Sequence, residues 1–308
     1  MVPPLYIVLI VIVILESSTG IALNLYIFNV NLKSMKSRQK IKPCDLIHLT
    51  KGLVNALLQL FLTMEILMVL VWFQKFFVKE VYLTCFVSLT ALGFFDYWLT
   101  AFLCAYYCST ISNLSFVVFT WVKRSIATFL PQLLLVSAMG SILFSVPSIW
   151  QISMTIHEQP IWNSTNESMI IGGTLFIGPV FEMTVGIFGC YLPFFLSLLS
   201  LTVTIFSLVR HIRHIRDINS NVDGPKLGPL INATRTMLLF LAIHVSFYLS
   251  GYFCILSSSV SIDLMSIISW FFLLFCPTAE ALTIIQSSSK LRDIFQVTFC
   301  STKTKSYN

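Results

Sequence analysis

Charged side chains inside apolar stretches are the residues of this sequence that could do chemistry: Glu16, Lys51, Glu65, Asp96 and Glu280. A charge buried in a membrane costs at least about 2.5 kcal/mol on insertion scales, so each one is a candidate for function. A carboxylate there contacts a ligand, hydrogen-bonds between helices, or is kept protonated by burial. Glu16 and Glu280 are interpreted as structural polar groups, and Lys51 is expected to pair with Glu280 or Asp45.

The remaining carboxylates could share one cavity. Glu65 and Asp96 are expected in the outer parts of their stretches, and Glu182 opens a later stretch on the same side. Three acidic groups around one cavity would favour a cationic, amphipathic ligand. The alternative is that each carboxylate only hydrogen-bonds neighbouring helices.

No other chemistry is indicated. The sequence has no nucleophile–base arrangement, no glycine-rich phosphate loop and no cofactor motif. His211 and His214 are three residues apart, but no carboxylate or cysteine completes a metal shell with them. We therefore expect no enzyme, no metal and no cofactor.

Composition identifies the kind of chain that positions these residues. The 308 residues are 56% hydrophobic and 10% charged, with a mean hydropathy of +0.86. Soluble domains carry about 25% charged residues, so this surface could not be solvated by water alone. A cytosolic enzyme, a disordered chain and a small disulfide scaffold are excluded, and a multi-pass membrane protein is indicated.

Seven apolar stretches exceed or approach the roughly 20 residues that one spanning helix needs. Lipid offers the backbone no hydrogen-bond partner, so all seven are expected to be helices in one all-α, seven-transmembrane domain covering residues 1–308. Their expected ranges are 5–28, 46–72, 86–118, 126–149, 181–209, 237–256 and 264–285.

Basic residues predict the orientation. Of the 19 Lys and Arg residues, 16 lie in the tail or in the connections after the first, third and fifth stretches. Because Lys and Arg accumulate on the cytoplasmic side, the N-terminus is expected outside and residues 210–235 inside. Residues 151–180 then form an extracellular loop, where Asn163 and Asn166 begin glycosylation sequons.

Seven helices with an extracellular N-terminus suggest a G-protein-coupled receptor by analogy of fold. The signatures of the large rhodopsin-like class are missing: the sixth stretch has no proline, and residues 151–180 contain no cysteine that could pair with Cys85. The motifs instead resemble the bitter taste receptor family, taste receptors type 2. They are Glu16, Gly20 and Asn24 at spacing four; Trp98-Leu99 through Tyr106-Tyr107 to Lys123; Leu192-Pro193-Phe194 with Ser207-Leu208 and His211; and Lys290-Leu291.

The sequence departs from this family at several positions. Asn55 stands where the family carries an arginine, so a polar lock between the first two helices would join Asn24 and Asn55. Glu280 replaces a family histidine. Leu89 and Gly93 align with the Trp and Asn that often line the family's ligand pocket. A long-diverged member is implied.

The resemblance implies a chemosensory receptor in the plasma membrane that binds a small tastant on its outer side and activates a heterotrimeric G protein, gustducin or another Gi-type. Expected ligand contacts are Glu65, Leu89, Gly93, Asp96, Glu182, Phe247, Tyr248 and Trp270. The expected G-protein-facing residues are Tyr107, Lys123, Arg124 and His211. Membrane lipids are expected partners, and nucleic acid is not.

Two other classes of protein remain as alternatives. The type 1 vomeronasal pheromone receptors are related but generally fit the Ser207-Leu208 and His211 pattern less well. A transporter or channel subunit is disfavoured, because the number of spans is odd and no internal repeat is visible.

Overall fold

The computed structural model describes residues 4–37, 42–71, 78–111, 117–160, 169–179, 183, 186–218, 228–257 and 264–299. Within these residues, seven helices are long and apolar enough to cross a membrane, as predicted. They are α1 (Pro4–Lys36), α2 (Pro43–Val71), α4 (Lys79–Ile111), α5 (Val117–Ser145), α8 (Leu192–Ile218) with the preceding π-helical turn η1 (Gly186–Tyr191), α9 (Gly228–Ser257) and α10 (Leu264–Ser287).

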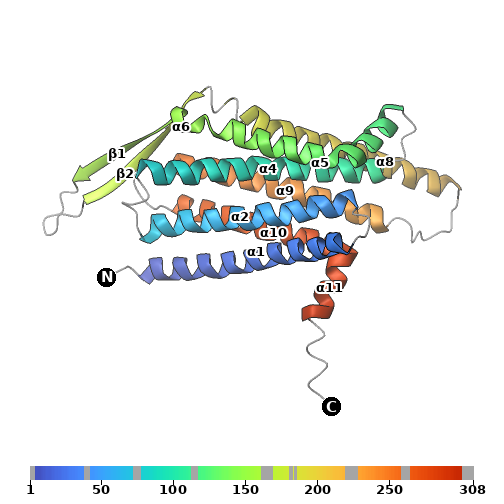
Figure 1. Ribbon diagram of the computed structural model, residues 1–308, viewed down its shortest axis with the longest axis horizontal. Coiled ribbons are helices and arrows are strands. Elements are labelled where there is room, and N and C mark those ends of the chain that lie inside the picture. Colours follow the sequence, from blue (N-terminus) through green and yellow to red (C-terminus); the bar gives the residue numbers. More distant parts are fainter. Residues whose placement is uncertain are drawn as a thin grey trace, which may run out of the picture.

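The seven helices run side by side in one bundle (Figure 1). Helix α1 packs on α2 and α10, α4 packs on α2, α5 and α8, and α9 packs on α10. The short helix α11 (Ser289–Phe299) turns away from the bundle at the end opposite to the N-terminus. The start of α1 and helix α11 therefore lie at opposite ends of the bundle, as an odd number of spans requires.

The connection 151–180 contains a β-hairpin that the sequence did not predict. After the short helix α6 (Ser148–Gln151), strand β1 (Ile152–Pro160) pairs antiparallel with β2 (Met169–Ile177), in a register from Ile152↔Ile177 to Pro160↔Met169. The hairpin extends beyond the end of the bundle that carries the N-terminus (Figure 1). Outside lipid the open strand edges can bond to water, which makes this exception to an all-α fold possible. Asn163 and Asn166 follow β1 and lie outside the described residues.

Several predicted helix boundaries are wrong, because hydropathy does not mark where a helix turns. The predicted third helix, 86–118, ends at Ile111, and α5 begins at Val117 rather than at 126. Lys123 and Arg124 therefore lie within α5 and not in a loop after the third helix. Residues 112–116, between the two helices, include two serines and an asparagine, a break signal that the hydropathy of the stretch as a whole concealed.

The predicted intracellular loop 210–235 is shorter than expected. Helix α8 continues to Ile218 and α9 already begins at Gly228. The prediction ended the fifth helix where charged residues begin. Outside the lipid, a helix can continue through charged residues such as Arg210 and Arg213, because its backbone hydrogen bonds do not depend on apolar side chains.

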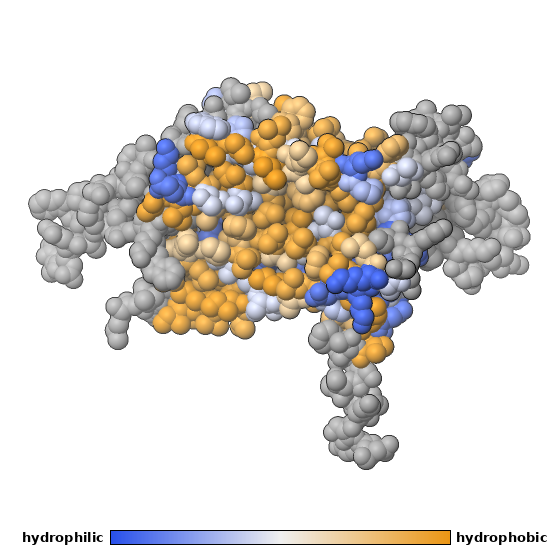
Figure 2. Space-filling view, viewed as in Figure 1, coloured by the Kyte–Doolittle hydropathy of each residue, from blue (hydrophilic) through white to orange (hydrophobic). Residues whose placement is uncertain are grey.

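The outward faces of the helices are apolar. On α5, for example, Leu135, Val136, Met139 and Leu143 are all more than 60% exposed. Hydrophobic side chains cover the middle of the visible face, and hydrophilic ones gather towards its two ends (Figure 2). This band matches what a bilayer requires of a helix bundle. Inside, residues such as Ile27, Leu99 and Phe240 form a fully buried cluster between the helices.

Two amide side chains brace the bundle where proline interrupts α10. Asn24 of α1 donates to the carbonyl oxygen of Pro277 at 3.2 Å, and Gln59 of α2 donates to that of Leu274 at 3.1 Å. Both acceptors lie within one turn of Pro277, so the amides of α1 and α2 hold α10 at the point where the proline removes one of its own backbone hydrogen bonds. The expected lock between Asn24 and Asn55 is wrong, because each amide bonds to α10 instead and neither amide oxygen has a partner.

Helices α1 and α2 approach each other closely at Gly52. A Cβ atom there would lie 2.8 Å from the carbonyl oxygen of Asn24 and 3.0 Å from the backbone nitrogen of Phe28. Both neighbouring atoms are backbone and cannot rotate away. This close approach places α2 so that Lys51 and Asn55 face the interior.

Candidate functional site

The centre of the bundle holds a buried ion cluster. The ammonium of Lys51 (α2) pairs with Asp96 (α4) and with Oε2 of Glu280 (α10), the latter at 2.6 Å. Asn55 donates to the same Glu280 oxygen at 2.8 Å. Lys51 is 0% exposed, Asp96 7% and Glu280 3%. One lysine therefore joins three helices by interactions that are buried inside the bundle.

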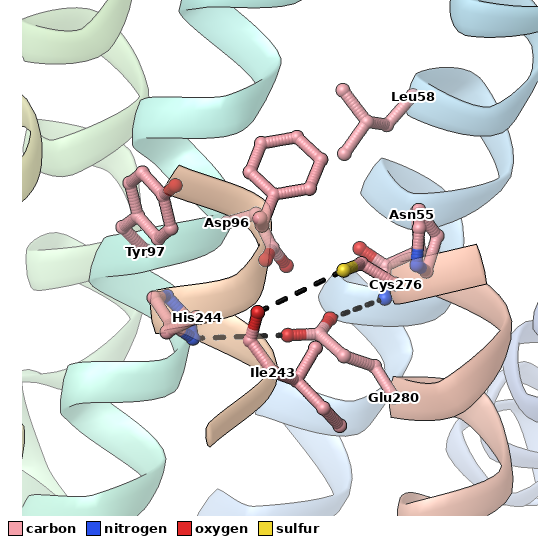
Figure 3. A pocket seen from close by; sticks show the side chains of 10 residues that line it. Asn55, Leu58, Asp96, Tyr97, Ile243, His244, Cys276 and Glu280 are labelled. Carbon is pink, nitrogen blue, oxygen red and sulfur yellow. Dashed lines mark hydrogen bonds and ion pairs between the residues drawn. The ribbon is translucent and has the colours of Figure 1, made fainter. Parts of the chain in front are cut away.

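A cavity lies beside this cluster. It is lined by Asn55, Leu58, Asp96, Tyr97, Ile243, His244, Phe247, Cys276, Pro277 and Glu280, and only about 10 Å³ of it is open to a water-sized sphere. Figure 3 shows Asp96, His244 and Glu280 gathered around this space, with Tyr97 beside them. The cavity therefore has room for at most about one water molecule and not for a ligand.

His244 closes the cavity from α9. Its Nδ1 lies 3.2 Å from the carbonyl oxygen of Phe240 and 3.9 Å from Oε1 of Glu280. Its ring packs against Tyr97 with centroids 4.4 Å apart. Neither His244 nor Tyr97 was predicted from the sequence, although a histidine within the stretch 237–256 was a usable signal.

Asp96 and Glu65 do not share the described cavity. Asp96 lines it, but its carboxylate is already paired with Lys51, so Asp96 is not a free counter-ion for a ligand. Glu65 is half-buried on α2 and does not line it; among the described residues its carboxylate has no hydrogen bond or ion pair. Glu182 lies outside the described residues.

The charged residues with structural assignments have mixed outcomes. Of the two partners expected for Lys51, Glu280 is found, while Asp45 accepts from Lys290 at 3.3 Å. Glu280 thus bonds between helices as interpreted. Glu16 is half-buried, and its Oε1 has no hydrogen-bond partner in the part of the chain described.

Three of the expected ligand contacts meet on one apolar cluster. Leu89 of α4, Phe247 of α9 and Trp270 of α10 pack against buried residues that include Leu58, Leu62 and Leu274. Gly93 belongs to the same region, because a Cβ there would lie 3.7 Å from Phe247. Tyr248 lies elsewhere: it is 37% exposed, and its hydroxyl is 3.1 Å from that of Tyr191.

The inner end of the bundle contains part of the expected G-protein surface. The hydroxyl of Tyr107 lies 3.8 Å from Sγ of Cys44, which is 3.6 Å from Nε2 of His48. Lys123 and Arg124 are in the first turns of α5 and His211 is in α8, but their side chains lie outside what the structure describes. Among the described residues, no three His, Cys, Asp or Glu side chains are arranged to hold a metal ion.

The fold defines the class of this protein. It resembles the crystal structure of squid rhodopsin with a TM-score of 0.67, over 97% of this chain and 87% of that chain, at 11% sequence identity. This chain is a multi-pass membrane protein with the fold of a G-protein-coupled receptor, a class of receptors that are not enzymes. Cys85 is a free cysteine, and the connection 151–180 contains no cysteine that could pair with it.

The family follows from the sequence comparison. The family model described as taste receptor protein (TAS2R) matches residues 1–303, and the chain belongs to this family. It is 24% identical to taste receptor type 2 member 40 of Gallus gallus, over 92% of this chain and 91% of the relative. It is 26% identical to member 1 of Chlorocebus aethiops (94% and 95%) and 28% identical to member 9 of Homo sapiens (64% and 63%). The protein is a chemosensory G-protein-coupled receptor, the reading that the sequence favoured over a pheromone receptor or a transporter.

Proposed function

We propose that this receptor binds small bitter-type molecules in the outer half of its helix bundle, in the plasma membrane, and activates a heterotrimeric G protein, gustducin or another Gi-type. The observation that carries the proposal is the convergence of Leu89, Phe247 and Trp270 from three helices onto one apolar cluster. Phe247 also lines the cavity beside the buried ion cluster, so the apolar cluster lies next to a few polar groups. Ligand sites in proteins have this composition.

The half-buried Glu65 on α2 favours a ligand that carries a positive charge. Because Asp96 is neutralised by Lys51, Glu65 is the better partner for a positively charged ligand. The side chains of the apolar cluster would have to move apart when a ligand binds, since the described cavity is too small for a complete ligand. The bound molecule would favour one of two helix packings, and the favoured packing would expose Tyr107, Lys123, Arg124 and His211 to the G protein.

The test is expression of the full chain in cultured cells with a promiscuous G-protein α subunit. Calcium responses to a panel of bitter compounds, with amines well represented, are recorded while surface labelling measures expression. A dose-dependent response that mock-transfected cells lack supports the proposal. Silence across the panel with normal surface expression counts against a bitter ligand, while leaving the fold and the family intact.

We expect Phe247→Ala to weaken the response at least about tenfold in half-maximal concentration, because truncating a residue that anchors a binding site costs about 2 kcal/mol or more. The measurement is a dose–response curve for an agonist found in the panel. Phe271→Ala is the matched control, since Phe271 is 49% exposed on the outward side of α10 and should leave potency unchanged. Equal losses in both variants would contradict a pocket at Phe247.

We expect Asn163 or Asn166 to carry a glycan, because the connection between α5 and α8 is expected outside the cell. Glycosidase treatment should increase the mobility of the protein on a denaturing gel. The double variant Asn163→Gln/Asn166→Gln should already migrate at that position. Unchanged mobility of the wild type after treatment would count against the proposed orientation.

A further inference from the structure

The interior face of α2 carries a line of residues that is polar at both ends and apolar between them. Asn55, Leu58, Leu62 and Glu65 follow one another at intervals of three and four residues, which places them on one side of the helix. The first three are buried and Glu65 is half-buried. Because a helix rises about 1.5 Å per residue, Asn55 and Glu65 lie about 15 Å apart along its axis.

The deep end of this line is a hydrogen-bond acceptor without a donor. Asn55 is 0% exposed, and because its Nδ2 donates to Glu280, its Oδ1 can only accept. Among the described residues, no group donates to this oxygen. Nε2 of His244 also has no partner in the described part of the chain, and Figure 3 shows Asn55 and His244 on opposite sides of the cavity. A buried acceptor that is left unpaired is costly, so a group that donates to it is favoured.

The cavity limits the size of the group that can reach this oxygen. Only about 10 Å³ is open to a water-sized sphere, which is room for about one water molecule. A hydroxyl has one oxygen, as water does, and carries a hydrogen that it can donate. A ligand hydroxyl in the place of a water reproduces the hydrogen bond of that water, so the exchange does not lose affinity.

The apolar part of the line connects this cavity to the proposed ligand site. Leu58 and Phe247 line the cavity and also belong to the apolar cluster on which Leu89 and Trp270 pack. The cavity and the apolar cluster therefore share a wall. When the side chains of the cluster move apart to admit a ligand, the deep end of that ligand comes next to Asn55.

We propose that the receptor selects elongated amphiphilic ligands with an ammonium at the outer end, an apolar middle and a hydroxyl at the deep end. The ammonium pairs with Glu65, the apolar middle lies along Leu62 and Leu58, and the hydroxyl donates to the amide oxygen of Asn55. The span from Glu65 to Asn55 sets the length of the ligand at about 15 Å. This inference rests on the proposed function and deepens it, because it adds a hydroxyl subsite and a length requirement to the cationic ligand.

The experiment compares two probes that differ by one hydroxyl. Decylamine and its analogue with a hydroxyl on the last carbon are titrated against the purified full-length receptor in lipid nanodiscs, and thermal unfolding is measured. A ligand that binds only the folded state raises the Tm by mass action. The hydroxylated amine should produce the same rise of Tm at a concentration at least about tenfold lower, because a site built for a hydroxyl discriminates against its absence. Equal or weaker binding of the hydroxylated amine would overturn the proposal.

Partitioning into lipid predicts the opposite order of the two probes, because the hydroxyl makes the molecule more polar. Two further comparisons test the length and the chemistry of the deep subsite. Butylamine and its analogue with a terminal hydroxyl are too short to reach both ends, so the hydroxyl should give no advantage there. If the decyl diamine binds as tightly as the hydroxylated decylamine, the deep end of the ligand is a second cation and the hydroxyl subsite is wrong.

Variants assign the two ends of the ligand. Asn55→Leu removes the acceptor and should make the two decyl probes equivalent, whereas Glu65→Gln should weaken both probes and keep their ratio. Asp45→Asn is the matched control, because Asp45 pairs with Lys290 at the inner end, and it should leave both probes unchanged. If Asn55→Leu does not fold, the comparison of probes on the wild type still decides. A preference for the hydroxyl that survives in a folded Asn55→Leu variant would overturn the assignment to Asn55.

The binding measurement uses no G protein, so its outcome is separate from the test of the proposed function. Cells that respond to the bitter panel, combined with a purified receptor that does not prefer the hydroxylated amine, would overturn this inference alone. Silent cells, combined with a Tm that depends on the hydroxyl, would contradict the proposed signalling and support the subsite.

Discussion

Replacing Lys51 with methionine is expected to destabilise the receptor by about 3–5 kcal/mol, the usual cost of removing one partner from a buried ion pair. The substitution leaves the carboxylates of Asp96 and Glu280 facing each other without a counter-charge, both under 10% exposed. Methionine is close to lysine in volume, so the effect is electrostatic rather than a packing defect. Surface labelling should fall sharply, and the Tm of the purified protein should drop with it.

A variant without any of the three charges tests whether the loss of stability in Lys51→Met comes from unpaired charge. The triple variant Lys51→Met/Asp96→Asn/Glu280→Gln should recover most of the lost expression, because buried ion pairs can often be replaced by neutral groups at little cost. Lys290→Met is the matched control: its pair with Asp45 is partly exposed, with side chains 32% and 25% accessible, and contributes only about 0–1 kcal/mol. Normal expression of Lys51→Met alone would mean that the cluster does not hold the helices together.

Gly52→Ala is expected to destabilise the bundle by about 1–3 kcal/mol, the range for overpacking a tight contact. The added methyl group would lie 2.8 Å from the Asn24 carbonyl oxygen and 3.0 Å from the Phe28 nitrogen, both atoms of the α1 backbone. Helix α1 would have to move as a unit, and Asn24 would lose its contact with Pro277 of α10. Thermal unfolding of the purified receptor measures the change.

Gly140→Ala provides the comparison for this effect. Gly140 lies in α5, and no atom is found within 4 Å of a Cβ built there. Alanine favours a helix over glycine by about 0.5–1 kcal/mol, so this variant should be as stable as the wild type or slightly more stable. If both glycine variants behaved alike, the close approach of α1 and α2 would not limit packing.

Much of the fold could be predicted because a membrane leaves a chain few choices. Lipid forces the backbone into helices, so seven apolar stretches gave seven helices, although their ends were misplaced by up to about nine residues. The ends depend on turns and on aqueous segments, where hydropathy is uninformative. For this reason neither the start of α5 at Val117 nor the hairpin of β1 and β2 was predicted.

The sequence indicated several residues of the candidate site but not the contacts between them. Buried charge made Lys51, Asp96 and Glu280 conspicuous in the sequence. Which of them pair depends on how α2, α4 and α10 rotate about their axes, which hydropathy alone did not specify. Asp96 was therefore expected to face a ligand, whereas it faces Lys51. His244 and Tyr97 were missed because neither carries a formal charge at neutral pH, although both line the cavity.

The sequence by itself determined the class of this protein: a multi-pass receptor of seven helices, with motifs of the taste receptor family in order along the chain. Composition and spacing suffice for that, because the cost of burying backbone in lipid does not depend on which helix contacts which. Only the tertiary structure decided that one lysine pairs with two carboxylates 45 and 229 residues away in the chain, and that Asn55 and His244 line the same cavity. Those contacts depend on the approach and rotation of whole helices, which side-chain packing such as that at Gly52 sets in three dimensions.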